Sequence, residues 1–211
     1  MVEYFSEIER LYVADGHHRC KSASRAVESF LGSDAAPEEA WFFPAVLFPM
    51  GDMLIMAYNR IIRKLPSTPE EFLAVLKTIF PNRPAADPIP AKKGEIAVYL
   101  AGRWTTFDLP EEQGSSVVDH LDVGLLSRHI LEPLLDITDP RTDSNIDFVG
   151  GIRGTKELEK LVDEGRAEMA ISLYPTSTQE LIDVSDAGLL MPPKSTWFEP
   201  KLRSGLLVHL F

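Results

Sequence analysis

The sequence has little that could cross-link the chain or carry it into a membrane. Cys20 is the only cysteine among 211 residues, which excludes an internal disulfide and a zinc site built from thiolates. Nowhere does it contain the run of about 18 apolar residues that a spanning helix needs. The first residues, MVEYFSEIER, lack a basic stretch followed by an apolar one, which argues against a secretory signal. We therefore expect no membrane contact and a cytoplasmic location.

Positive charge is also scarce. Lysine and arginine number 21 against 32 aspartates and glutamates, which gives a formal net charge of -11. This balance repels a polyanion, which argues against DNA as a partner. A local cluster of donors can still override the distant charge within a Debye length of roughly 8 to 10 Å. The partner class that remains is a small anionic ligand, and the sequence leaves the oligomeric state open.

The composition is that of an ordinary globular domain. Apolar residues make up 45% and charged residues 25% of the chain, and 211 residues suffice for one substantial core. Strand-like and helix-like segments alternate, with at least two expected hairpins, which predicts an α+β fold with a mixed, largely antiparallel sheet and flanking helices. We expect a single domain over residues 1–211, with a possible sub-boundary in the proline-rich stretch 81–94.

Local patterns predict where the elements lie. Capping boxes at Thr68 with Glu71 and at Ser177 with Glu180 each predict the start of a helix. A strand at 11–13 should lead through Gly16 into a helix that ends at Gly32. The remaining predictions are a hairpin from the apolar runs 41–49 and 53–62, a hairpin over 96–109, a mostly helical stretch at 117–135 bent or ended by Pro133, strands at 146–149 and 168–175, and a helix at 155–165.

The first candidate site is VADGHHR, residues 13–19, at the predicted strand-to-helix junction. Free backbone N–H groups and the positive end of the helix dipole meet there, and Gly16 allows a phosphate to approach closely. His17, His18 and Arg19 add donors, while Asp15 could hold Mg²⁺ or accept a proton. The alternative is that Asp15 only caps the helix and one histidine satisfies a buried carbonyl group.

A transition-metal site is a weaker interpretation of the same region. It would need further ligands, which Asp119, His120 and Asp122 could in principle supply. Adjacent histidines such as His17 and His18 point apart on a strand or at a helix start, so they rarely bind one ion.

The second candidate is MPPKSTWFEPKLRSG, residues 191–205, a locally basic segment in an acidic chain. Its cations and hydroxyls are candidate phosphate ligands: Lys194, Ser195, Thr196, Lys201 and Arg203. Three prolines restrict the backbone, so these donors would be preorganised. We expect Lys194 or Arg203 to lie within reach of the Asp15 loop. The alternative is that the aromatic residues of the segment fill the core while the cations pair with surface carboxylates.

Two further stretches carry weaker signals. FVGGIRG, residues 148–154, lacks the spacing of a dinucleotide-binding or phosphate-binding loop. Asn59 and Arg60 interrupt an apolar strand, which indicates either a buried hydrogen-bond network or contact with a substrate. We take Asn59, Arg60 and Arg153 as candidate substrate-binding residues.

Several motifs in order resemble one known family. VADGHHR, DPRTD, IDFVGGIRG, LYPTS and MPPKSTWFEPKLRSGL together look like the bacterial and archaeal family called domain of unknown function 1015, from about Leu11 to Leu210. The resemblance begins in what would be the middle of a family member, so the chain looks like a C-terminal half. It thereby implies a further possible partner, the missing N-terminal half.

DGHHR also resembles the nucleotide-phosphate loop of the ParB and sulfiredoxin-like superfamily, which includes ParB-type CTPases and free-serine kinases. This resemblance implies that a ParB/sulfiredoxin-like element lies at the N-terminus. It implies that Asp15, His17, His18 and Arg19 lie beside the phosphates of ADP or ATP, with Mg²⁺ as the accompanying ion. We take Asp15 and His17 as the candidate catalytic residues and Asp15 as the candidate metal ligand. The implied function is a nucleotide-dependent phosphotransferase acting on a small, serine-like molecule. A non-catalytic regulatory module that binds a nucleotide or phosphometabolite would need the same loop, so it stays an alternative. A DNA-binding partition protein fits the acidic balance poorly.

Overall fold

The computed structural model describes residues 2–28, 30, 37–111, 114, 116–203, 205–206 and 208–209. Its chain divides into two compact units. The sheet unit is Ile55–Trp197, and the helix unit combines Met1–Leu54 with Phe198–Phe211. The expectations of one domain and of a sub-boundary at 81–94 stay predictions.

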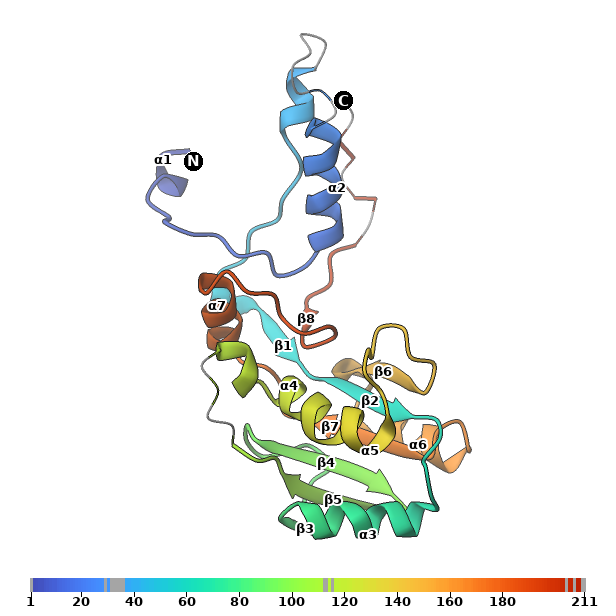
Figure 1. Cartoon of the computed structure of the whole chain (residues 1–211). Coiled ribbons are helices and arrows are strands. Elements are labelled where there is room, and N and C mark those ends of the chain that lie inside the picture. The colour runs from blue at the N-terminus through green and yellow to red at the C-terminus, as the bar shows by residue number, and fades with distance from the viewer. Residues whose placement is uncertain are drawn as a thin grey trace. The chain divides into compact units, whose positions relative to one another are not determined.

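The sheet unit is built on a six-stranded sheet with the order β3-β5-β4-β7-β2-β6 (Figure 1). Each of its described strand pairings is antiparallel, and β2 lies between β6 and β7. The strands are β2 (Tyr58–Ile62), β3 (Asn82–Pro84), β4 (Glu95–Leu100), β5 (Arg103–Asp108), β6 (Ile146–Gly150) and β7 (Met169–Leu173). The predicted α+β class with a largely antiparallel sheet is confirmed.

Alternation along the strands gives the sheet two apolar faces. Ile62, Val98 and Ile171 belong to one cluster, in which the sheet packs against α3 (Pro69–Ile79), α4 (Asp122–Leu126) and the helical turns that follow α4. Ile61, Tyr99 and Ala170 point the other way, into a smaller cluster with α6 (Thr155–Asp163). Helices therefore cover the sheet on both faces, as its nearly all-apolar central strands require.

The helices of the sheet unit start where the sequence predicts. Thr68 and Ser177 form complete capping boxes with Glu71 and Glu180, and they open α3 and α7 (Thr178–Asp186). After α4 the helix widens into a π-helical segment at Ser127–Leu131 and continues as α5 (Glu132–Leu135), with Pro133 in its first turn. Proline has no N–H to give to the preceding turn, so an altered hydrogen-bond pattern next to it is expected. η3 (Val117–His120) precedes α4, and η5 (Gly151–Arg153) leads into α6.

The helix unit has less regular structure. It contains α1 (Val2–Phe5), α2 (His17–Glu28), η1 (Glu38–Trp41) and η2 (Met50–Asp52). β1 (Leu54–Met56) and β8 (Trp197–Glu199) form a separate two-stranded sheet, and the boundary between the units runs through both strands. Gly32, the predicted end of the second helix, lies outside the described residues.

Two sequence predictions are wrong. Residues 11–13 form no strand; they are irregular and their side chains are exposed. The hairpin over 41–62 is absent too, because 42–49 is irregular while the second run forms β1 and β2 instead. Pro44 and Pro49 cannot donate to a ladder, so the first run is a poor sheet strand despite its aromatic residues. β2 finds its partners in β6 and β7, far along the chain.

Candidate functional site

The residues selected from the sequence fall into two groups. The helix unit holds Asp15, Gly16, His17, His18, Arg19, Lys201 and Arg203, and the sheet unit holds Asn59, Arg60, Arg153, Lys194, Ser195 and Thr196. The structure thus joins one end of the basic segment to the Asp15 loop and the other end to the strands β2 and β6.

The Asp15 loop is shaped by a glycine in a left-handed conformation. Gly16 has φ +88°, and a Cβ there would lie 3.0 Å from a terminal nitrogen of Arg19. The Arg19 guanidinium therefore folds back over Gly16, whose left-handed backbone favours a residue without a side chain. Oδ1 of Asp15 accepts a hydrogen bond from the Gly16 N–H at 2.8 Å, and the carbonyl of Gly16 accepts the first helical bond from the Cys20 N–H. The Arg19 guanidinium thus lies at the N-terminus of its own helix, α2.

Lys201 contacts this loop from the other end of the sequence. Its Nζ donates to Oδ2 of Asp15 at 3.2 Å, across 186 positions of sequence. Partial burial raises the pKa of Asp15, but the hydrogen bonds from Lys201 and the Gly16 N–H outweigh it and hold the pKa below its usual value. Asp15 is therefore ionised at neutral pH. His17, His18 and Arg203 are exposed.

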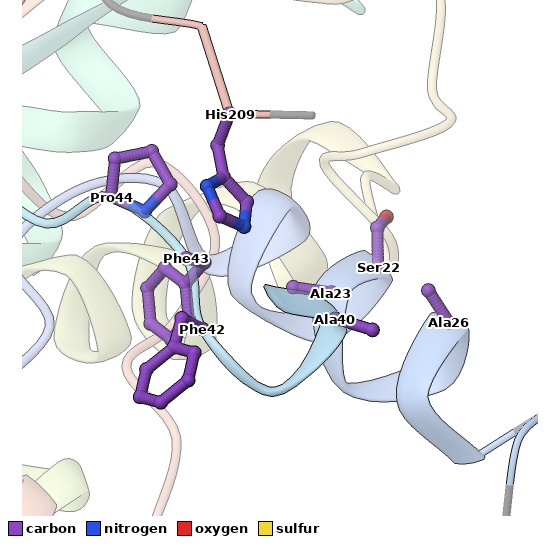
Figure 2. A pocket seen from close by; sticks show the side chains of 8 residues that line it. All are labelled: Ser22, Ala23, Ala26, Ala40, Phe42, Phe43, Pro44 and His209. Carbon is purple, nitrogen blue, oxygen red and sulfur yellow. The ribbon is translucent and has the colours of Figure 1, made fainter. Parts of the chain in front are cut away.

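An apolar hollow of about 340 Å³ opens beside α2, within the helix unit. Figure 2 shows the methyl groups of Ala23 and Ala26 on one side and the rings of Phe42 and Phe43 on the other, with the His209 imidazole pointing in between them. Nε2 of His209 lies 2.8 Å from the carbonyl oxygen of Glu39, which fixes this wall. Sequence reasoning missed the hollow because the exposed aromatic residues at 41–43 were interpreted as a strand.

In the sheet unit, Arg60 is a buried cation. One of its terminal nitrogens donates to the carbonyl of Lys194 at 3.0 Å and the other to the carbonyl of Tyr58, while its guanidinium lies 5.5 Å from the centre of the Phe148 ring. Burial lowers its pKa to about 9. The side chain of Asn59 is buried as well, and its Oδ1 accepts from the Leu173 N–H. The sequence left two interpretations of Asn59 and Arg60, a buried hydrogen-bond network or contact with a substrate. These contacts match the first.

The bonds to Arg60 hold a tight turn in place. Lys194 has φ +56°, an unusual backbone for a residue with a side chain, and its Nζ lies 5.2 Å from the centre of the Tyr58 ring. Oγ of Ser195 donates to the Pro192 carbonyl at 2.5 Å, and Thr176 donates to the Ser195 carbonyl at 3.3 Å. Strained residues persist only where several contacts fix them. Here these contacts fix the backbone of Lys194, a residue that is exposed.

Aromatic packing anchors the same turn. The Trp197 ring meets the Tyr58 ring edge-on at 5.2 Å, and a Cβ on Gly150 would overlap Trp197. Gly150, the first glycine of the FVGGIRG stretch, is therefore needed for packing against Trp197. No role for this glycine was predicted from the sequence. Arg153 is exposed and lies 3.8 Å from Glu157, one turn further along.

A preformed metal centre is absent from the described residues: no three histidine, cysteine or carboxylate side chains gather around one point there. Asp119 instead pairs with Arg128 at 2.8 Å, and the His120 ring meets the carbonyl of Gly114 at 3.1 Å. Both oxygens of Asp122 accept from the Gly94 N–H. Nor does any described helix have the length and apolar character needed to cross a membrane.

Comparison with known proteins places the chain in a family. Residues 1–124, more than half of the chain, match the family described as "Protein of unknown function (DUF1015)". The chain therefore belongs to the DUF1015 family, as the motifs indicated; that it is a C-terminal half, or ParB-like, stays a prediction. No curated protein matches it.

Solved structures of a free serine kinase also resemble the chain. The complex with AMP gives a TM-score of 0.48 at 14% sequence identity, and a variant complexed with ADP gives 0.47 at 17%. In both, the match covers 88% of this chain and 66% of the kinase chain. A likeness of this size says nothing about the activity of this protein.

Proposed function

We propose that this protein is a nucleotide-dependent phosphotransferase acting on a small hydroxylated molecule, with the Asp15 loop as its phosphate cradle. The observation that carries the proposal is the meeting of Arg19, Lys201 and the start of α2 around Gly16. A helix start and two cations make a site for an anion in a chain whose net charge is -11. The resemblance of DGHHR to a nucleotide-phosphate loop supports the same assignment.

Each residue of the loop has a proposed task. Phosphoryl transfer depends mainly on positioning and on neutralising the charge of the phosphates, which Arg19, His18 and Lys201 would provide. The bond from the terminal phosphorus to the nucleotide oxygen breaks, and a bond to the substrate hydroxyl oxygen forms. The hydroxyl proton passes to a ring nitrogen of His17, because histidine is the side chain that most often serves as a general base.

Asp15 fits a cation better than a proton. Its lowered pKa makes it a weak base, whereas a carboxylate that stays ionised suits Mg²⁺. Mg²⁺ usually takes one or two protein carboxylates plus phosphate oxygens, so a single aspartate suffices when the nucleotide is bound. The ion would neutralise phosphate charge. Asp15 would then exchange its contact with Lys201 for the ion, which would release the ammonium group to the phosphates.

The other candidate residues belong to the sheet unit, and each is proposed for that unit by itself. Lys194 presents an exposed ammonium group on a fixed turn, and Lys194 and Thr196 are proposed for phosphate contacts. Ser195 is buried and its hydroxyl donates to the Pro192 carbonyl, so it would act by holding this turn. Asn59, Arg60 and Arg153 are proposed for the substrate. Of these three only Arg153 is exposed, so Asn59 and Arg60 would act by holding the strands and the turn.

The test is nucleotide binding followed by product detection. Thermal stabilisation by ADP, ATP and CTP with Mg²⁺ should appear at millimolar concentration, and hits are then assayed with L-serine and other hydroxylated amino acids. Arg19→Ala should abolish the stabilisation. Arg25→Ala is the matched control, because it removes the same charge from an exposed position further along α2.

The outcomes separate the alternatives. Stabilisation with product supports the phosphotransferase, and stabilisation without product supports the regulatory module. If no nucleotide stabilises the protein, or if Arg19→Ala binds as well as the unaltered chain, the loop is not a phosphate cradle.

A further inference from the structure

We infer that the apolar hollow beside α2 is the subsite for the nucleobase of the nucleotide. This inference rests on the proposed function, since it concerns the same ligand. The phosphates would lie at the Asp15 loop and the planar ring would enter the hollow between Ala23 and Phe43 (Figure 2).

The first argument is the character of the hollow. Its volume of about 340 Å³ is within the range of small-molecule sites and exceeds what a single base ring needs. Alanine methyls and phenylalanine rings form most of the lining, while the Ser22 hydroxyl and the His209 imidazole add polar groups at the edge. A nucleobase is a planar heterocycle with apolar faces and a polar edge, so it matches this lining. Every base can stack on an aromatic side chain, because every base has a π-face.

The second argument is the direction of α2. Arg19, Ala23 and Ala26 are separated by four and three positions, so they form one stripe along the helix. The hollow therefore lies on the same face of α2 as the arginine of the cradle. At 1.5 Å per residue, Ala23 and Ala26 lie about 9 to 14 Å along the axis from His17. A ribose with its phosphates can bridge such a separation.

The third argument is the path of the C-terminal segment. Lys201 contacts Asp15 at the start of α2, and His209 contacts the carbonyl of Glu39 beside the hollow. One short segment therefore supplies a cation at the phosphate end and a ring at the base end. A ligand that spans both ends would touch this segment twice, at Lys201 and at His209.

The fourth argument is exposure. Phe42 is 60% and Phe43 is 55% exposed, although both belong to the lining. Large apolar side chains that form a concave exposed surface are typical of a binding site. A stacked base would cover ring surface that otherwise faces water.

The experiment compares two ligands that differ by the base and ribose. Isothermal titration calorimetry on the whole chain measures ADP and inorganic pyrophosphate, each with Mg²⁺. We expect ADP to bind at least about tenfold more tightly, since stacking of one base on an aromatic ring commonly contributes that much. Ala23→Leu fills the hollow, so it should remove this advantage and leave pyrophosphate binding unchanged.

Controls make the result specific. Ser24→Leu adds the same side chain to an exposed position on another face of α2, and it should keep the full advantage of ADP. Phe43→Ala removes a wall without adding volume, so it tests the subsite if Ala23→Leu disturbs the helix. Far-ultraviolet circular dichroism checks the fold of each variant.

Three results would overturn the inference. If ADP and pyrophosphate bind the unaltered chain equally well, the base makes no contact, although the phosphate cradle stands. Equal ADP affinities for Ala23→Leu, Phe43→Ala and the unaltered chain would place the base elsewhere. If neither ligand binds the unaltered chain, the proposed function fails and the subsite fails with it.

Discussion

The sheet unit and the helix unit both contain large apolar side chains, but the sheet unit buries most of them and the helix unit leaves most of them exposed. Among the described residues, the buried apolar side chains lie in the sheet unit with the exceptions of Ala40 and Phe198. In the helix unit, by contrast, α2 has no buried residue and the aromatic residues at 41–43 are exposed. The sheet unit is thus stabilised by its own core. The proposed phosphate cradle and the hollow lie on the part of the chain that has little core.

This difference shows how the helix unit is held. Its C-terminal segment contacts the rest of the unit through polar groups, Lys201 on Asp15 and His209 on Glu39. Segments with few buried apolar contacts open most easily, and binding regions are commonly drawn from them. A ligand in the cradle and the hollow would add the contacts that the unit lacks, so binding should order it.

The largest expected effect comes from removing a core ring of the sheet unit. Phe107 is 0% exposed in the main cluster, so Phe107→Ala should lower the free energy of unfolding by about 3 to 5 kcal/mol, since it deletes buried surface and leaves a cavity. Phe42→Ala, a matched truncation in the helix unit, should change it by less than about 1 kcal/mol. Urea denaturation followed by circular dichroism measures both. Equal losses would mean that the helix unit has a core of its own.

A pH-dependent effect of intermediate size should come from Asp122. Its burial, despite the bond from the Gly94 N–H, raises the pKa from 3.8 to about 6. The folded protein therefore keeps a proton that the unfolded chain loses, so this group lowers stability as pH rises from about 4 to 6. One pKa unit corresponds to about 1.4 kcal/mol, which gives a loss of about 3 kcal/mol by pH 7.

Asp122→Asn tests that assignment, since an amide does not titrate. We expect the stability of the variant relative to the unaltered chain to increase between pH 4 and pH 7, measured by urea denaturation at each pH. Its amide oxygen can still accept from Gly94, which preserves the local contact. A constant difference across this range would show that Asp122 ionises normally.

The smallest effect on stability is expected at the ion pair between Lys201 and Asp15, which connects the C-terminal segment to the Asp15 loop. Lys201 and Asp15 are both about half exposed, so Lys201→Ala should lower the free energy of unfolding by less than about 1 kcal/mol. The pKa of Asp15, followed by carbon-detected NMR, should nevertheless rise, because its main favourable partner is gone. Lys21→Ala, an exposed change on α2, should leave that pKa unaltered. If Asp15 titrates identically in both variants, the pair does not form in solution.

The sequence by itself determined the elements whose signals are local. The capping boxes at Thr68 and Ser177 placed two helices, and the apolar runs of β4, β5 and β7 placed the strands, because such patterns act through neighbouring residues. The Asp15 loop and the basic segment were selected from residue types alone, and their roles stay predictions. The strand expected at 11–13 and the first strand of the hairpin expected at 41–62 are absent because a strand needs a partner, and neither run pairs with another strand. The second run of that hairpin pairs with distant strands instead.

Only the tertiary structure decided which distant residues meet. That Lys201 pairs with Asp15, that Arg60 holds the turn at Lys194, and that Gly150 makes room for Trp197 depend on chain positions separated by tens to hundreds of residues. No spacing in the sequence encodes such contacts, since they follow from how the strands are ordered and where the C-terminal segment passes. The hollow beside α2 is of the same kind, because its walls come from three separate segments.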